Sequence, residues 1–249
     1  MSIWPEGVGH KIFDTLDSTN AEAVRAAARG EVGPIWYLAL EQTQSRARRG
    51  RPWDRGAGNF SASLLMHPDG GLEQAALRSF IAALALREAL IEVCGRADLF
   101  TLKWPNDVLL NGRKLAGILL ESGQGYLCIG IGVNLISEPH SDFIEAGAMA
   151  PISLRSATGL TISPKDFLPS IAAAFARWEG QFQQYGFAPI RHEWLNHATR
   201  LGTKVSAKLM DRTVVGTFET IDETGAIVLI TPKGPVHLPA AEIYFETET

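Results

Sequence analysis

Five arginines lie close together near residue 50 and make the densest positive segment of the chain. They fall within ten positions, with Asp54 as the one acidic residue among them; they are Arg46, Arg48, Arg49, Arg51 and Arg55. A guanidinium group can hold two oxygens of a phosphate or a carboxylate at once. A loop this rich in arginine therefore predicts a site for an anionic ligand.

A second segment whose residues could take part in a reaction begins about fifty residues later. Residues 103–107 read Lys-Trp-Pro-Asn-Asp, and Lys114 follows after an Asn-Gly turn. Pro105 forces Trp104 into extended backbone, so this segment is a bent, non-helical edge that presents the lysine and the Asn-Asp pair to one place. Two cationic segments of this kind are typical of a site that activates a carboxylic acid with ATP.

Composition and charge limit the classes of protein that fit. The chain has 249 residues, a hydrophobic fraction of 46% and a net charge of −4. No apolar run approaches the roughly 18 residues that span a bilayer, and the first residues do not form a secretory signal, so we expect no membrane partner and a cytoplasmic location. The net negative charge argues against a nucleic-acid partner. Cys94 and Cys128 have no ligand-like spacing, and we expect both to be buried free thiols.

Hydrophobic periodicity predicts an α+β protein with a mixed sheet and helices packed on it. A Thr-x-x-Glu capping box at Thr19 precedes an Ala-rich helix, and Ser163 with Pro164 begins a later one. Strands are expected at 12–16, 35–40, 59–66, 99–102, 108–110, 114–121 and 126–133, and helices at 21–29, 72–93 and 164–185.

The hydrophobic pattern of the sequence changes near residue 200. Short alternating strands are expected at 205–209, 214–221, 226–231 and 236–238, separated by turn-rich steps. We therefore predict two domains, a catalytic domain at 1–199 and a small C-terminal β barrel at 200–249.

Four motifs in this order resemble the biotin protein ligases. They are Ser-Thr-Asn at 18–20, the arginine loop, the segment from Lys103 to residue 117, and Gly-Ile-Gly-Val-Asn at 130–134. The family loop usually reads Gly-Arg-Gly-Arg-Arg-Gly-Arg before a tryptophan. The match covers nearly the whole chain and implies an SH3-like barrel at the C-terminus. About ten residues precede the first strand, so we expect no N-terminal DNA-binding domain.

The resemblance also implies which residues hold each substrate. The ureido ring of biotin is neutral, with two donors and one acceptor that need partners when buried. Implied biotin-binding residues are Ser18, Thr19, Asn20, Gln42, Arg46, Ala47, Arg48 and Lys114. Implied ATP-binding residues are Arg48, Arg49, Arg51, Trp53, Lys103, Asn106 and Asn134, and implied catalytic residues are Lys114, Arg46, Arg48 and Asp107.

Each of these assignments has a plainer alternative. Lys114 could be a structural lysine on a hairpin, and the arginines a solvated loop or a nucleic-acid patch. Ser18 and Thr19 could serve as helix caps, and Trp53 as a core anchor. Asp107 could orient ATP or Mg²⁺, hold Lys114, or deprotonate the acceptor lysine, whose unperturbed pKa is about 10.4.

The first step of such a reaction needs charge neutralisation rather than a general base. The carboxylate of biotin is already ionised at neutral pH and must approach the α-phosphate of ATP. Cationic side chains should carry that step, with Mg²⁺ on the leaving pyrophosphate. The six histidines are scattered, so the sequence predicts no protein metal site beyond the Mg²⁺ that comes with ATP.

One departure from the family pattern lies in the arginine loop. Ser45 and Ala47 stand where the family has glycine, which tolerates positive φ and close ligand approach. If either position needs positive φ, the mismatch costs about 1–2 kcal/mol in the ordered loop. We expect altered affinity rather than lost activity, because no cationic side chain is missing.

The sequence thus predicts a ligase that joins biotin to ATP and then to a lysine of the biotin carboxyl-carrier domain of acetyl-CoA carboxylase or a related carboxylase. One alternative is a lipoate or octanoate ligase or transferase, which shares the catalytic fold. The other is a module that binds biotin or its adenylate without transferring it. Whether the chain forms a homodimer stays open.

Overall fold

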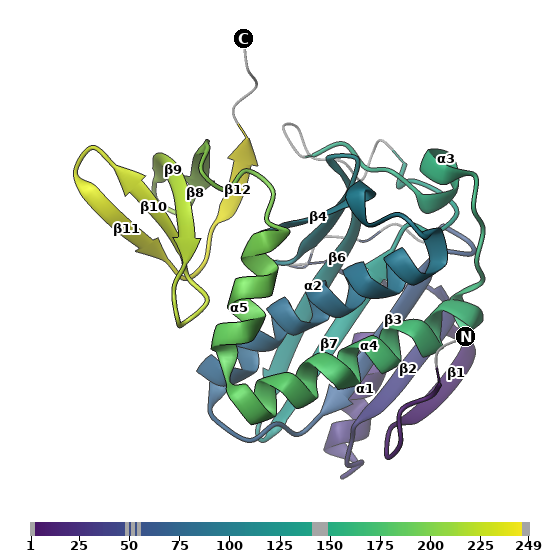
Figure 1. Ribbon diagram of the computed structural model, residues 1–249. Helices are drawn as coiled ribbons and strands as arrows, with labels where there is room; N and C mark the ends of the chain where they lie inside the picture. Colours follow the sequence, from purple (N-terminus) through teal and green to yellow (C-terminus); the bar gives the residue numbers. More distant parts are fainter. Residues whose placement is uncertain (1–2, 48–49, 51–52, 54–55, 141–148, 246–249) are drawn as a thin grey trace.

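A seven-stranded mixed sheet is the centre of the molecule (Figure 1). The computed structural model describes residues 3–47, 50, 53, 56–140 and 149–245. The strands run in the order β1-β2-β3-β7-β6-β5-β4, with β1 and β2 parallel and all other neighbours antiparallel. Their bounds are β1 Gly9–Leu16, β2 Ile35–Gln42, β3 Phe60–Met66, β4 Phe100–Lys103, β5 Asp107–Leu110, β6 Arg113–Gly123 and β7 Tyr126–Val133.

Helices cover both faces of this sheet (Figure 1). The two long helices α2 (Leu72–Cys94) and α4 (Pro164–Tyr185) pack against each other over one face, where the main apolar core lies. Helix α4 begins as predicted, with Ser163 as its cap and Pro164 in its first turn. On the other face α1 (Thr19–Ala28) packs on β3 and β7 through a small cluster that includes Ala23 and Ala26.

Several local predictions need correction. The cap of α1 is Ser18, whose Oγ accepts from the backbone of Ala21, so the predicted Thr19 capping box is wrong. Cys128 is a buried free thiol, but Cys94 is only half-buried because it lies in the last turn of α2. Two helices were not predicted, α3 (Leu154–Thr158) and α5 (Phe187–Asn196). Their few apolar positions give too short a periodic pattern.

The Asn-Gly turn forms the predicted hairpin between β5 and β6. Asn111 and Gly112 have φ of 49° and 72°, the left-handed pair that a type I′ turn requires. This turn sets the register of β6, so that Lys114 pairs with Leu109 next to the hairpin end. The Lys-Trp-Pro-Asn-Asp segment connects β4 to β5, as a bent edge should.

The C-terminal part is a five-stranded antiparallel sheet in the order β11-β10-β9-β8-β12. The strands are β8 Lys204–Lys208, β9 Thr213–Ile221, β10 Ile227–Thr231, β11 Gly234–Leu238 and β12 Glu242–Phe245. Four of them match the predicted alternating segments, whereas β12 was not predicted. Closure of this sheet into a barrel, and the boundary at residue 200, stay predictions.

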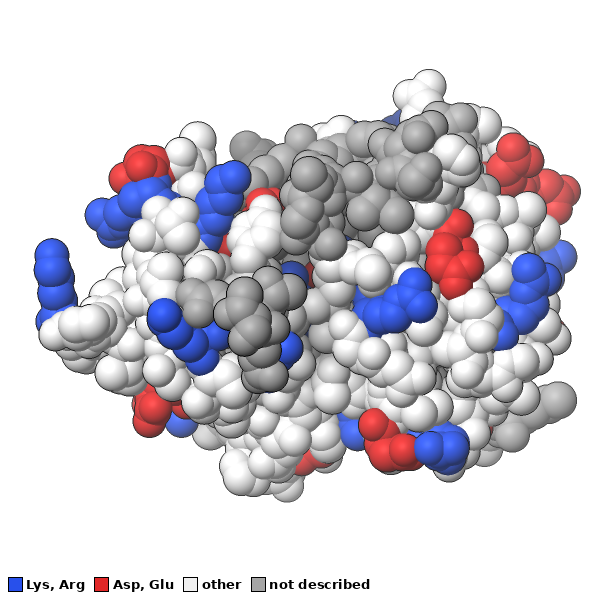
Figure 2. Space-filling model, turned by 90° about the horizontal axis from the view of Figure 1, so that it is seen from above, with Lys and Arg blue, Asp and Glu red and all other residues white. Residues whose placement is uncertain are grey.

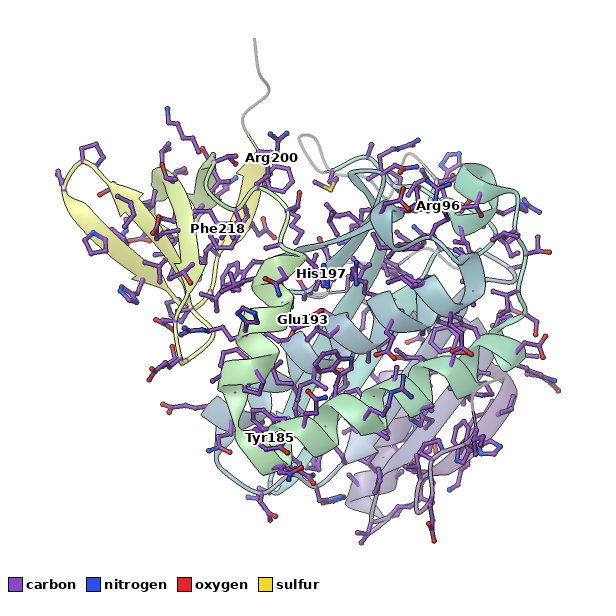
Figure 3. The ribbon with its side chains drawn as sticks, viewed as in Figure 1. Arg96, Tyr185, Glu193, His197, Arg200 and Phe218 are labelled. Atoms are coloured by element: carbon purple, nitrogen blue, oxygen red, sulfur yellow. The ribbon has the colours of Figure 1, made fainter. Side chains whose placement is uncertain are left out.

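The connection between the two sheets is tied to the larger one. Leu102 on β4 donates its backbone N–H to His197 O and accepts from Thr199 N, each at 2.8 Å. Figure 3 shows Glu193 in the last turn of α5 and His197 just after the helix, with His197 Nε2 2.8 Å from Glu193 Oε1. The indole N–H of Trp104 donates to Gly225 O at 3.0 Å across the seam between the two sheets. The C-terminal sheet is therefore held at the β4 edge.

None of the helices formed by the described residues is long and apolar enough to cross a bilayer.

Candidate active site

A cavity of about 350 Å³ collects the residues that the motifs singled out. Its walls come from the β1–α1 turn, the ends of the arginine loop, the β4–β5 turn, β6, β7 and β12. Twelve predicted residues line it: Ser18, Thr19, Asn20, Gln42, Arg46, Ala47, Trp53, Lys103, Asn106, Asp107, Lys114 and Asn134. The predicted residues Arg48, Arg49 and Arg51 lie outside the described residues.

Uncharged polar groups form one side of this cavity. Gln42 Oε1 accepts from Thr19 N at 2.7 Å and from Thr19 Oγ1 at 3.2 Å. Ser63 Oγ lies 2.8 Å from Thr19 Oγ1 and 2.5 Å from Asn20 Oδ1. Ser18 caps α1 and also lines the cavity, so its two predicted roles are compatible. These groups offer a neutral ligand both donors and acceptors in fixed positions.

A carboxylate stands beside this neutral network. Glu121 on β6 accepts from Asn20 Nδ2 at 2.7 Å, and its other oxygen lies 3.0 Å from Arg46 Nη2. Asn20 is 4% exposed, so its amide is fixed at both ends, by Ser63 and by Glu121. The first arginine of the loop is thereby linked to the neutral side of the cavity.

Lys114 and Asp107 form an ion pair inside the cavity. Lys114 Nζ lies 2.8 Å from Asp107 Oδ1, with Asp107 9% exposed. This contact is an ion pair without hydrogen-bond geometry, since Asp107 Oδ1 has no hydrogen-bond partner among the described residues. Asn106 Nδ2 donates to Ile118 O at 2.5 Å and fixes the turn beside it. Asp107 is the one ion-pair partner of Lys114 among the described residues, and a lysine ammonium has three donors, so it can also meet an incoming anion.

The ring of Trp53 lies against the glycines of β6 and β7. A Cβ placed on Gly132 would be 2.8 Å from Trp53 Nε1, and one on Gly117 would be 3.3 Å from the same ring. Glycine is thus required at position 132 by close approach, as strand glycines often are. Lys114 Nζ is 5.7 Å from the centroid of the indole. Trp53 is half-buried and lines the cavity, so it is more than a core anchor.

Ser45 ties the two ends of the arginine loop together. Its hydroxyl donates to Trp53 O at 2.5 Å, and its own carbonyl accepts from Trp53 N at 3.2 Å. Neither Ser45 nor Ala47 has positive φ, so the glycine-to-serine and glycine-to-alanine departures cause no backbone strain in this structure. The serine adds a hydrogen bond that glycine cannot make.

The C-terminal sheet contributes a wall that the sequence did not predict. Residues 242–245 of β12 line the cavity, and two cations lie near the ring of Phe245. Its centroid is 5.3 Å from Lys103 Nζ and 5.3 Å from the guanidinium carbon of Arg200, which Figure 3 places where the connection enters the C-terminal sheet. The tail is therefore part of the site.

Asn134 has a structural duty as well as a place in the cavity wall. It is 3% exposed, its amide donates to Ile152 O at 3.2 Å, and its backbone binds Leu115 and Leu154. Asn134 thus fixes the end of β7 beside Lys114.

Ser63 and Glu121 were also missed by the sequence analysis. Both lie on predicted strands, where neighbouring apolar residues dominate the pattern. The available signal was a carboxylate placed directly after the apolar run of β6, opposite Cys128. Burial and the nearby carboxylate raise the pKa of the Cys128 thiol well above its ordinary range.

Charged side chains of both signs lie on the face of the molecule that is seen from above. Among its described side chains, lysines and arginines are mixed with acidic residues (Figure 2). The described residues contain no cluster of three His, Cys, Asp or Glu side chains that could hold a metal ion. Two carboxylates line the cavity, Asp107 and Glu242, and a Mg²⁺ that arrives with ATP would find no larger set of acidic ligands among the described lining residues.

Comparison with known proteins gives two family matches. Residues 26–134 match the Biotin/lipoate A/B protein ligase family, and residues 201–246 match the Biotin protein ligase C terminal domain. A Paracoccus denitrificans protein named biotin--[acetyl-CoA-carboxylase] ligase is 49% identical over 92% of this chain and 97% of its own length. The Bacillus subtilis bifunctional ligase/repressor BirA is 31% identical over 94% of this chain and 73% of its length.

Solved structures agree on the fold. The biotin protein ligase from Aquifex aeolicus in complex with biotin and ATP superimposes with a TM-score of 0.81 at 24% identity, covering 94% of this chain and 97% of that one. The predicted α+β fold with a mixed sheet, packed helices and a small C-terminal β domain is confirmed. The chain belongs to the biotin protein ligase family.

Proposed function

We propose that this chain is an ATP-dependent biotin–protein ligase. It activates biotin to biotinyl-5′-AMP with release of pyrophosphate and then transfers the biotinyl group to a lysine of a carrier protein. The observation that carries the proposal is that a neutral polar side and a cationic side meet in one cavity. The similarity to the Paracoccus denitrificans ligase supports the same activity.

The neutral side suits the ureido ring of biotin. Thr19, Asn20 and Gln42 supply hydroxyl and amide groups whose partners are already fixed. Burying a ureido group against such groups avoids the cost of unpaired donors, about 1–3 kcal/mol for each. We assign Ser18 and Ala47 to the same half of the cavity, which they line.

The cationic side suits the carboxylate and the phosphates. Lys114 and Arg46 neutralise the biotin carboxylate and the acyl-phosphate, while Lys103 with Asn106 receives ATP. Trp53 offers an aromatic face to the adenine, and Asn134 supports the strand end. Arg48, Arg49 and Arg51 are assigned to the substrates from the sequence pattern alone, since they lie outside the described residues.

Asp107 acts by holding Lys114. Its carboxylate is 2.8 Å from the ammonium and nearly buried, which fits a positioning role better than that of a base exposed to the acceptor lysine. Mg²⁺ would come with ATP and would supply charge neutralisation for the departing pyrophosphate. The protein side chains bind and orient the two substrates.

The acceptor is the biotin carboxyl-carrier domain of acetyl-CoA carboxylase or a related carboxylase, as the name of the Paracoccus denitrificans relative suggests. A cytoplasmic location fits this acceptor. The boundary between catalytic and C-terminal domains at residue 200 is supported by the family match that starts at residue 201. The lack of a nucleic-acid partner and the possibility of a homodimer stay predictions of the sequence.

ATP–pyrophosphate exchange tests the activation step. We expect Mg²⁺-dependent exchange with biotin and none with lipoate or octanoate. Exchange with lipoate or octanoate alone would favour the lipoate-type alternative instead. A folded chain that binds biotin but shows no exchange with any acid would be a binding module.

A further inference from the structure

Glu121 holds a cation that the substrate also needs. Glu121 is not itself part of the cavity wall, but its carboxylate contacts two residues that are: it accepts from Asn20 Nδ2 at 2.7 Å and lies 3.0 Å from Arg46 Nη2. Arg46 therefore lines the cavity while its charge is balanced by this chain's own carboxylate. An anionic ligand that uses Arg46 must compete with Glu121.

The two bonds of Glu121 differ in strength. Asn20 is 4% exposed and its amide is also held by Ser63, so the Asn20–Glu121 bond belongs to a fixed network. Arg46 and Glu121 have side chains 43% and 32% exposed, and ion pairs at such exposure are weak and easily exchanged. Arg46 can therefore leave Glu121 while Glu121 stays on Asn20.

We propose that Glu121 is a positioning residue that keeps Arg46 beside Asn20 in the empty site and competes with the carboxylate of the acid substrate for it. This inference rests on the proposed function, because the competing anion is the carboxylate of biotin. Its consequence is specific: Glu121 weakens the binding of anionic ligands and has no such effect on neutral ones. A small anion that does not fill the ureido side would then gain little binding free energy from Arg46, because it must compete with Glu121 for that arginine.

The variant Glu121→Gln isolates the charge. Glutamine has the same shape, and its side-chain oxygen can still accept from Asn20 Nδ2. Titration calorimetry would compare biotin with biotinol, which carries a neutral alcohol in place of the carboxylate. We expect E121Q to lower the Kd for biotin by about two- to fivefold and to leave the Kd for biotinol unchanged. In an Arg46→Ala background, E121Q should no longer change the biotin Kd.

A matched control lies outside the cavity. Glu88 on α2 also pairs with an arginine, Arg177, and also accepts from a neutral N–H, that of Trp178 at 2.9 Å. We expect E88Q to leave both dissociation constants unchanged. A second variant, Glu121→Ala, removes the acceptor for Asn20 as well, and we expect it to raise the Kd for biotinol.

The outcomes separate this inference from the proposed function. Equal shifts for biotin and biotinol in E121Q, or a biotin shift that persists without Arg46, would overturn the competing role of Glu121 while leaving the ligase assignment standing. If the unaltered chain did not bind biotin at all, the proposed function would fail and this inference with it. A biotin-specific shift that requires Arg46 supports both.

Discussion

The ion pair between Lys114 and Asp107 shows how one residue can depend on another within the site. The hairpin turn at Asn111-Gly112 brings Lys114 onto β6 opposite β5, and Asp107 on β5 meets its ammonium at 2.8 Å. Lys114 could not hold this geometry alone, because a lysine side chain has four rotatable bonds. The charge of Asp107 is therefore what positions the Lys114 ammonium.

Replacing Asp107 by asparagine should therefore slow both chemical steps. We expect about a tenfold loss in the rate of adenylate formation and a similar loss in transfer from preformed biotinyl-adenylate, because Lys114 is less well placed in each. Single-turnover measurements of the two steps would check this. Slowing confined to transfer would show instead that Asp107 acts as a base toward the acceptor lysine.

Asp17 makes a pH-dependent contribution next to the site. Hydrogen bonds from the Arg25 guanidinium lower the pKa of Asp17 from 3.8 to about 2, and Asp17 also accepts from the backbone of Ser18. A carboxyl whose pKa is lower in the folded state stabilises the fold above its unfolded pKa, and that stabilisation is lost as pH falls through the folded value.

The variant Asp17→Asn should thus lose stability at pH 6 but less so at pH 3. Urea unfolding of both proteins at the two pH values measures the difference directly. An equal difference at pH 6 and pH 3 would mean that the charge of Asp17 does not stabilise the β1–α1 turn.

At the scale of elements, the arginine loop is shaped by the residues at its two ends. Ser45 hydrogen-bonds Trp53 through both its hydroxyl and its carbonyl, and the indole of Trp53 lies on Gly132 of β7. The family glycine at position 45 could not make the hydroxyl bond. We therefore regard Ser45 as a local compensation rather than a defect.

Changing Ser45 to glycine should lower the free energy of unfolding by about 1 kcal/mol, the usual contribution of one hydrogen bond. Ala47→Gly is the control, because it adds the same backbone freedom without removing a side-chain bond. Denaturant unfolding would give the free energy of unfolding of both variants, and the difference between the two losses is the contribution of the Ser45 hydroxyl. Identical losses in the two variants would contradict a role for the Ser45 hydroxyl.

The sequence predicted elements better than it predicted contacts between them. Long periodic segments such as α2 and β7 were found almost to the residue, and the Asn-Gly turn fixed the hairpin that carries Lys114. The role of Glu121 was missed because it depends on a contact with Arg46, which lies 75 positions away in the chain. Such a pairing follows from sheet register, which local patterns do not specify.

At the scale of the whole molecule, the C-terminal sheet completes the cavity. Strand β12 was not predicted from the sequence, yet all four of its residues line the cavity. The seam is held by Trp104, which is 3% exposed and donates to Gly225 O. The same Lys-Trp-Pro-Asn-Asp segment thus lines the cavity and anchors the C-terminal sheet.

Trp104→Phe should test this coupling. Phenylalanine keeps most of the apolar volume but leaves Gly225 O without the indole donor, so we expect a loss of about 1–3 kcal/mol in the free energy of unfolding. Because β12 would be less firmly held, we also expect the KM for ATP to rise above that of the unaltered chain. We expect the KM for biotin to rise less. A loss of stability with both KM values unchanged would mean that the seam does not influence the site.

The most direct test of the central claim is transfer to a carrier. The protein would be incubated with ATP, Mg²⁺, biotin and the unmodified biotin carboxyl-carrier domain of an acetyl-CoA carboxylase, and the carrier would be weighed by mass spectrometry. The account predicts the addition of one biotinyl group at one lysine, and no addition without ATP. A carrier left unmodified by biotin, while a lipoyl-carrier domain is modified with lipoate, would contradict it.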